Sequence, residues 1–88
     1  MPYIEGDLIS GKFDSSEKIF SLQKVKNFSI QTNLNEKLTN HLYSYLKVHE
    51  QDEDGIILTL YDQIPIMITR NEVKKLLKDL ERVKLLFH

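Results

Sequence analysis

The chain has 88 residues, of which 41% are hydrophobic and 28% are charged. This length predicts one globular domain (residues 1–88) with a modest margin of stability, because so short a chain buries only about 60% of its unfolded surface. The chain contains no cysteine, which excludes disulfide frameworks, thiolate zinc sites and cysteine nucleophiles. A formal net charge of −1 gives no overall preference for nucleic acid or for anionic lipid.

The sequence carries no feature that directs it to a membrane. No segment reaches the roughly 18 consecutive apolar residues of a membrane-spanning helix. The first residues have neither the basic nor the apolar region of a secretory signal. Together with the lack of cysteine, this pattern fits a reducing compartment, and we expect a cytoplasmic protein with no membrane partner.

The first third of the chain alternates as extended strands do. The pattern predicts one long strand over residues 3–13, a polar turn over residues 14–17, and further strands over residues 18–22 and 28–32. Between the last two strands the alternation loses its phase, since Val25 does not share the face of Phe20 and Leu22. The short connections predict an antiparallel meander.

A helix is expected next, ending near Val48. Its apolar residues recur at helical spacing; they are Leu34, Leu38, Leu42, Tyr45 and Leu46. Two residues compete to cap it, because Asn33 has Glu36 three positions later as in a capping box, and Asn35 is also a good cap. An acidic loop over residues 49–54 follows and is closed by Gly55.

The last part of the chain predicts strand, turn, strand and helix. Residues 56–61 and 64–68 alternate with period two around a polar break at residues 62–63, and Pro65 places the second strand at a sheet edge. Thr69 and Glu72 have the spacing of a capping box for a long amphipathic helix. We expect the apolar residues 85–87 to complete the core, with a partner contact as the alternative.

The resulting order, β-β-β-α-β-β-α, defines the predicted fold class. We expect an α+β two-layer sandwich, with a mainly antiparallel five-stranded sheet and two helices on one face. The pattern does not fix the order of the strands across the sheet.

No catalytic or metal-binding pattern is present, and we expect neither enzymatic activity nor a cofactor. His41, Tyr45 and His49 share one face of the first helix, but they lack the carboxylate of a two-histidine metal site. The acidic loop lacks the spacing of a calcium loop, and three glycines in the whole chain exclude a glycine-rich phosphate loop. A small enzyme would need a pocket that joins His41, Tyr45 and a carboxylate.

The favoured function is a small protein-interaction module, such as an inhibitor or an accessory protein, that self-associates as a homodimer. Ile57, Tyr61 and Met67 lie on the second faces of their strands, and an uncovered face of this kind is unusually apolar for a monomer. The acidic loop offers a docking surface for a basic partner. The candidate partner-binding residues are Ile57, Tyr61, Met67, Glu50, Asp52, Glu53 and Asp54.

The alternative is a nucleic-acid-binding domain that uses the last helix. Its candidate residues, spaced by four along one stripe, are Arg70, Lys74, Lys78 and Arg82. Phosphate contacts need such a stripe, and Lys24 and Lys26 would add charge from the sheet. However, Asp79 and Glu81 are expected to interrupt it, and no aromatic side chain accompanies the lysines for base stacking.

Overall fold

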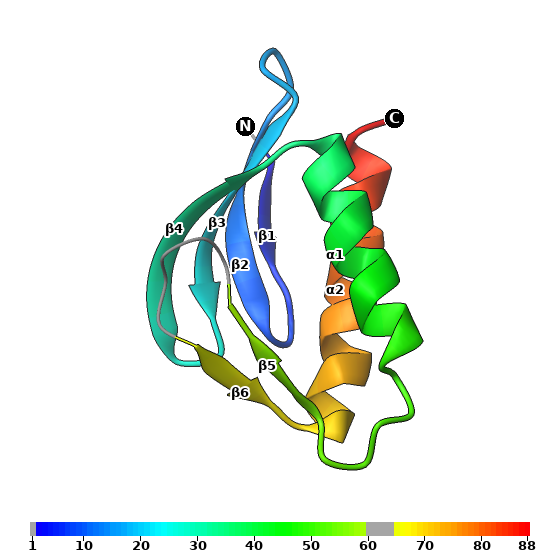
Figure 1. Ribbon diagram of the computed structural model, residues 1–88. Coiled ribbons are helices and arrows are strands. Elements are labelled where there is room, and N and C mark those ends of the chain that lie inside the picture. The colour runs from blue at the N-terminus through cyan, green and yellow to red at the C-terminus, as the bar shows by residue number, and fades with distance from the viewer. Residues whose placement is uncertain (1, 60–64) are drawn as a thin grey trace.

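A four-stranded antiparallel meander forms one layer of the computed structural model, which describes residues 2–59 and 65–88 (Figure 1). Its strands, in the order β1-β2-β3-β4, are β1 (Tyr3–Glu5), β2 (Ile9–Asp14), β3 (Ile19–Val25) and β4 (Phe28–Leu34). The remaining elements are α1 (Glu36–Val48), β5 (Ile56–Leu58), β6 (Ile66–Ile68) and α2 (Arg70–Leu86). In the described ranges, neither helix is long and apolar enough to cross a membrane.

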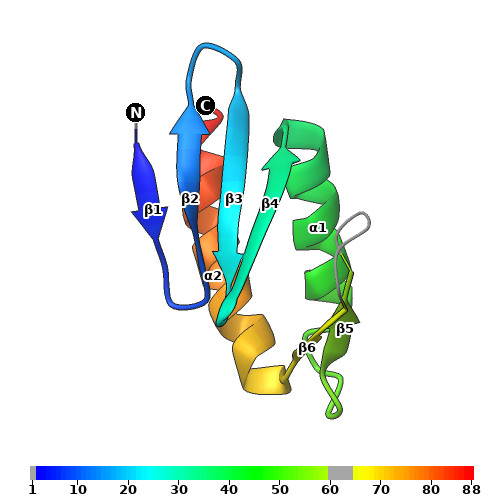
Figure 2. The same ribbon diagram turned by 90° about the vertical axis from the view of Figure 1, so that its left-hand side faces the viewer.

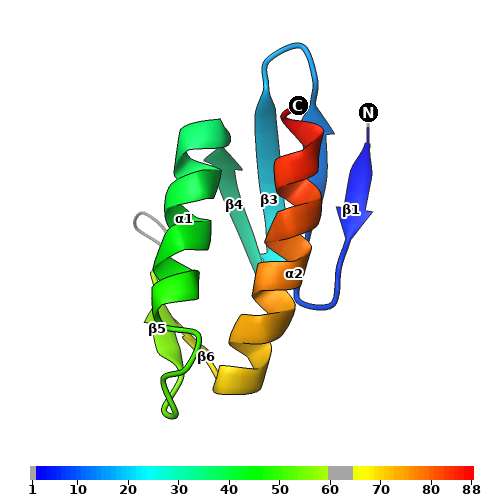
Figure 3. The same cartoon turned by 90° about the vertical axis from the view of Figure 1, so that its right-hand side faces the viewer.

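Both helices lie on the same face of the meander and form the second layer. α2 crosses behind β2 and β3, whereas α1 lies beside β4 (Figure 2). The view from the opposite side shows α1 and α2 next to each other, with β1 beyond the cover of either helix (Figure 3). The core between the layers receives apolar side chains from every strand and both helices, so that one core joins all elements.

The expected five-stranded sheet is wrong, although the α+β class is confirmed. β5 and β6 form a separate two-stranded antiparallel sheet. This hairpin lies at one end of the sandwich, close to the beginning of β4 and the end of α1 (Figure 1). Alternation shows which face of a strand is buried, but it does not show which strand pairs with it. Here the inward side chains of β5 and β6 pack into the core, but the two strands do not pair with the meander.

The expected single strand over residues 3–13 is also wrong, because a turn divides it into β1 and β2. The carboxylate of Asp79 in α2 holds this turn. Its Oδ1 accepts a hydrogen bond from the amide of Asp7 (3.1 Å), and its Oδ2 accepts from Leu8 (2.7 Å) and Ile9 (3.1 Å). A side chain at Gly6 would collide with the same carboxylate, so glycine permits the helix to approach.

The burial of Asp79 corrects its expected place on the polar side of the last helix. Its side chain is only 3% exposed, although it was expected to interrupt the basic stripe at the surface. Asp79 lies at the margin of the apolar stripe of α2, where helical spacing alone does not decide between core and solvent. The amides of the β1–β2 turn favour the buried position of the Asp79 side chain, because buried N–H groups need hydrogen-bond acceptors.

A register shift explains the lost phase around Val25. In the pairing of β3 with β4, Leu22 faces Thr32, but the next paired residue of β3, Lys24, faces Ser29. This irregularity returns the side chain of Val25 to the inner face, where it is fully buried. Bulges of this kind change the phase of a strand without ending it.

The helix boundaries confirm one of the two alternative caps of α1. The Oδ1 of Asn35 accepts a hydrogen bond from the backbone amide of Leu38 (2.8 Å), and Asn35 is therefore the N-cap. Asn33 is not the cap, because β4 continues to Leu34 and the Asn33 side chain instead accepts the hydroxyl of Ser21 (3.1 Å).

The second helix begins and ends as its sequence indicates. Thr69 and Glu72 form the expected capping box. At the other end, the ring of Phe87 is buried edge-on against Phe13, with 5.0 Å between ring centroids. Leu86 packs against the core, whereas Leu85 is 71% exposed. The expectation of a core contact therefore holds for two of these three residues.

We predict that removing the Asp79 carboxylate strongly destabilises the fold. Asp79→Ala leaves three amides without their acceptor and should lower the free energy of unfolding by about 3 kcal/mol, with a smaller loss for Asp79→Asn. Urea unfolding measures both, with the exposed Lys78→Ala as the control. In Asp79→Asn, amide exchange should quicken first at Asp7, Leu8 and Ile9. Unfolding of Asp79→Ala at the wild-type urea midpoint would show that the turn does not depend on this carboxylate.

Candidate interaction surface

The outer face of the β5–β6 hairpin presents two large apolar side chains. Ile57 and Met67 are direct cross-strand partners, and they are 59% and 54% exposed. Their neighbours in both strands point into the core. The third apolar residue expected on this face, Tyr61, lies outside the described residues.

A groove separates α1 from β5 beside this apolar pair. Its volume is about 400 Å³, and its lining residues are His41, Leu42, Tyr45, Ile57, Leu58 and Thr59. The loop over residues 49–55 joins the end of α1 to the beginning of β5, and none of its residues lines the groove. We call this groove, together with the outer face of the hairpin, the hairpin surface.

Two of the four acidic residues of the loop between α1 and β5 are paired locally. Glu50 contacts Lys47 (3.4 Å), and Asp52 contacts the Nδ1 of His49 (2.6 Å). Glu53 and Asp54 are exposed and form no salt bridge within the described residues. The negative charge that a partner would meet therefore comes mainly from these last two residues.

Gly55 turns the acidic loop into β5. Its φ of +74° lies in the left-handed region, where glycine is strongly favoured. A side chain here would also collide with the carbonyl oxygen of Ile68. The loop can therefore approach the end of β6 and start the hairpin directly.

A polar cluster fixes the hairpin to the meander. The Lys26 ammonium group, from the turn between β3 and β4, donates to the carbonyl oxygen of Met67 (2.9 Å) and pairs with Glu72 (3.0 Å). Glu72 also accepts the amide of Thr69 (2.9 Å). The same carboxylate therefore caps α2 and anchors the turn that holds β6, which makes Lys26 a structural cation and not a freely available one.

The hydrogen bonds of this cluster lower the pKa of Glu72 below its ordinary value of 4.5. The largest cause is the amide of Thr69, and the hydrogen bond from Lys26 acts in the same direction, whereas burial opposes them. Each interaction favours the ionised carboxylate.

The exposed side of α2 forms a second charged surface. Its exposed basic residues, here called the basic face, are Lys74, Lys75, Lys78 and Arg82. Asp79 does not interrupt this face, because its side chain is buried beneath the helix. Glu81 accepts the hydroxyl of Tyr43 in α1 (3.0 Å), which raises the pKa of that tyrosine. Arg70 is half-buried and donates to Gln51 in the loop (2.9 Å), so it is directed away from the basic face.

The structure brings together two of the three groups required by the enzyme hypothesis. His41 and Tyr45 both line the groove, but no carboxylate from residues 2–59 or 65–88 lines it. Over the described ranges, no group of three or more metal-ligating side chains is found. The rings of Tyr45 and His49 pack together with 4.6 Å between their centroids. The Nδ1 of His49 is paired with the carboxylate of Asp52.

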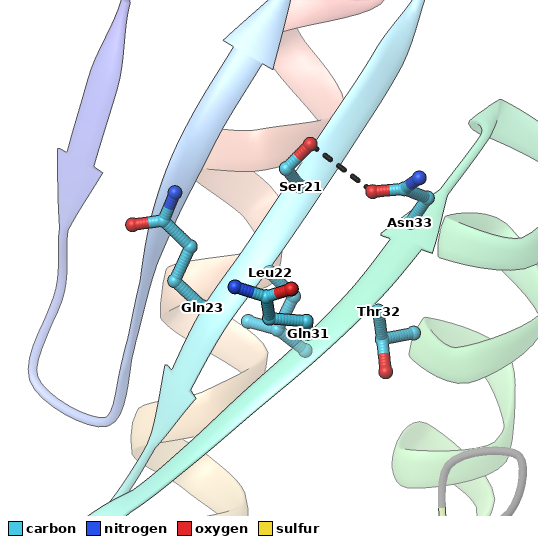
Figure 4. A pocket seen from close by; sticks show the side chains of 6 residues that line it. All are labelled: Ser21, Leu22, Gln23, Gln31, Thr32 and Asn33. Atoms are coloured by element: carbon cyan, nitrogen blue, oxygen red, sulfur yellow. Dashed lines mark hydrogen bonds between the residues drawn. The ribbon is translucent and has the colours of Figure 1, made fainter.

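A second hollow, of about 210 Å³, lies on the sheet face opposite the helices (Figure 4). Its walls come from β3 and β4 and consist mostly of hydroxyl and amide side chains; they are Ser21, Leu22, Gln23, Gln31, Thr32 and Asn33. None of these residues titrates near neutral pH, and Ser21 is engaged by Asn33. The hollow offers hydrogen bonds but no activated nucleophile.

Comparisons of the chain with protein-family models, with curated proteins and with solved structures returned no match.

The sequence indicated the two faces of the hairpin but did not show the groove. Tyr45 and Ile57 are twelve positions apart, and nothing in their local patterns places α1 beside β5. The shared helix face of His41 and Tyr45 was the available signal, and it pointed to metal or acid–base chemistry. In the structure they line a groove together with Ile57 and Leu58 of β5.

We predict that Glu72 contributes to an acid-dependent loss of stability. Because its pKa is lowered in the folded state, the unfolded state binds more protons at acidic pH. The stability supplied by the ionised group is therefore present above about pH 4.5 and is lost as the pH falls through the folded-state value. Glu72→Gln should lower the free energy of unfolding by about 1 kcal/mol at pH 7. Between pH 5 and pH 3, the free energy of unfolding of this variant should change less with pH than that of the wild type, as measured by urea unfolding.

The exposed acidic loop provides the control for this measurement. Glu53→Gln removes a carboxylate that has no salt bridge within the described residues, and it should leave the acid dependence nearly unchanged. If the free energy of unfolding depends on pH equally in wild type and in Glu72→Gln, protonation of Glu72 is not coupled to folding.

Proposed function

We propose that this chain is a small, non-enzymatic, self-associating protein-interaction module that binds polypeptide through the hairpin surface. The observation that carries the proposal is the exposure of Ile57 and Met67 opposite each other on one short hairpin. Covering the exposed half of both side chains would contribute roughly 2 kcal/mol. Their exposure brings nothing to the fold, because the alternate residues of both strands already supply the core.

The surroundings of the apolar pair support a polypeptide as the ligand. The groove adds the rings of Tyr45 and His41 to the same surface, and aromatic residues are enriched at the centres of protein interfaces. The acidic loop provides a charged rim. An apolar centre with a polar rim is the usual arrangement of an interface between proteins.

We predict that Ile57→Lys combined with Met67→Lys abolishes self-association and leaves folding intact. Both side chains point outward, so the free energy of unfolding should change by no more than about 1 kcal/mol. Sedimentation velocity over a range of concentrations would show a monomer in place of the wild-type oligomer. The matched control is Ser29→Lys with Gln31→Lys, which adds the same charge at exposed positions of β4.

Two results would contradict the proposal. Wild-type protein that is monomeric at every concentration and captures no polypeptide would remove its basis. An oligomer that survives the double lysine substitution but is lost in the β4 control would place the interface on the outer face of the meander instead.

A second candidate function, nucleic-acid binding, is supported by one observation. The inward position of Asp79 leaves the basic face without an acidic residue in its centre. The four cations could neutralise up to four phosphates. The logarithm of the binding constant for duplex DNA would then fall with the logarithm of the salt concentration with a slope of about −3.6. Contacts from lysine and arginine to phosphates carry no sequence information, so binding of this kind would not depend on the sequence of the DNA.

We predict for this second function that Lys74→Glu combined with Lys78→Glu greatly reduces retention of duplex DNA at low salt. The measurement is fluorescence anisotropy of a labelled duplex, with Lys12→Glu and Lys18→Glu at exposed positions of the meander as the control of equal charge. Unchanged anisotropy in the helix variant would reject the nucleic-acid function.

A further inference from the structure

We propose that the outer edge of β1 pairs with β1 of a second copy, antiparallel and about a twofold axis that passes between the two Ile4 residues. The two meanders then form one continuous sheet. This contact goes beyond the hairpin surface, because β1 and the hairpin lie at opposite margins of the molecule (Figure 2). It rests on the proposed function in one respect, since the hairpin surface forms the dimers that this edge then joins.

Two backbone hydrogen bonds show which way the peptide groups of β1 point. Phe13 donates its amide to the carbonyl oxygen of Pro2 (2.9 Å), and Gly6 donates to the carbonyl oxygen of Ile9 (2.8 Å). Both bonds fit the register of β1 on β2, in which pairs that exchange hydrogen bonds alternate with pairs that do not. Even-numbered positions of β1 therefore bond to β2, and odd-numbered positions direct their N–H and C=O groups away from it.

The outward-facing peptide groups of β1 belong to Tyr3 and Glu5. In the described part of the chain, β2 is the only strand that pairs with β1, and neither helix covers it (Figure 3). Each of the two residues thus presents an N–H and a C=O group to solvent, at the spacing that an added strand requires.

The spacing of these groups is self-complementary. When two copies of β1 lie antiparallel with Ile4 opposite Ile4, Tyr3 of each copy faces Glu5 of the other. Each of these pairs exchanges both of its hydrogen bonds, and the twofold axis relates one pair to the other. A shift by one residue would turn the side chains to the wrong face, and a shift by two would oppose Glu5 to Glu5 or leave only Tyr3 paired.

The outward side chains favour a second copy over another strand. A charged residue such as Glu5 on an edge strand discourages most added strands. In the proposed register, however, Glu5 of one copy lies opposite the uncharged Tyr3 of the other, whose partner in β2 is Lys12. Glu5 and Lys12 are exposed, and neither forms a salt bridge among the described residues. They would lie two strand spacings apart, about 10 Å between Cα atoms, within the combined reach of both side chains.

Pairing over so short a strand is weak by itself. A two-stranded contact is marginal in water, and association carries a large cost in translational and rotational freedom. A dimer formed through the hairpin surface carries two β1 edges, and two edge contacts made at once between two dimers reinforce each other. We therefore expect a closed tetramer of the wild type, whereas a chain that cannot dimerise through its hairpin should remain a monomer.

The register is tested with cysteine, which the chain lacks. Tyr3→Cys and Glu5→Cys are prepared as separate variants, mixed in equal amounts and oxidised, and the linked dimer is followed on a non-reducing gel. The two positions should lie about 5.5 Å apart between Cα atoms, a distance that a disulfide spans. The mixture should crosslink about tenfold faster than either variant alone, because equivalent positions of two copies lie farther apart. Ser29→Cys, exposed in β4, mixed with Glu5→Cys measures random collision.

The backbone bonds are tested with proline. Glu5→Pro removes an outward N–H group but none of the bonds to β2, a substitution that sheet edges tolerate. In sedimentation velocity this variant should stop at the dimer at concentrations where the wild type forms tetramers, with an unchanged urea midpoint. The matched control, Glu5→Gln, keeps the N–H group and should retain the tetramer.

The results that would overturn the inference are separate from those that would overturn the proposed function. Equal crosslinking rates in the mixture and in the Ser29→Cys control, or a wild type that stops at the dimer at every concentration, would reject a second copy as the partner of this edge. If Ile57→Lys with Met67→Lys still abolishes association in that case, the proposed function stands. If the mixture crosslinks rapidly but that double variant associates like the wild type, the proposed function fails and the edge contact remains.

Discussion

The hydrogen bonds of Asp79 are the constraint on which the rest of the structure depends. A carboxylate that is 3% exposed is costly unless its oxygens are satisfied, and here three backbone amides from the other end of the chain satisfy them. The interaction fixes the rotation of α2 about its own axis, because Asp79 must point at the β1–β2 turn. That rotation places the apolar stripe of α2 over β2 and leaves Lys74, Lys78 and Arg82 facing solvent.

Two further contacts make α2 a rigid support for the hairpin. At its beginning, Glu72 both caps the helix and holds Lys26, which in turn binds the backbone of Met67. At its end, Phe87 packs on Phe13. β6 therefore leads directly into a helix that is held at its start, middle and end. The apolar pair on the hairpin is displayed on a fixed frame, and a fixed frame lowers the entropic cost of binding.

The distribution of charge gives this frame its functional character. The net charge of −1 conceals an acidic loop between α1 and β5 and a basic face on α2. Because Asp79 is withdrawn into the core, the two regions are more distinct on the surface than they are along the sequence. Separated charges of this kind orient the encounter with any surface of complementary charge.

The sequence by itself determined the elements and their inner faces. Alternation predicted the strands, and the Thr69–Glu72 spacing predicted the start of α2, because these signals depend on residues within one turn or one strand. The division of residues 3–13, the separate hairpin and the groove between Tyr45 and Ile57 were decided only by the tertiary structure. Each of these depends on a partner distant in the chain: Asp79 for the turn, Lys26 for the hairpin, and β5 for Tyr45. Local patterns report which side of an element is apolar, but packing alone selects what that side meets.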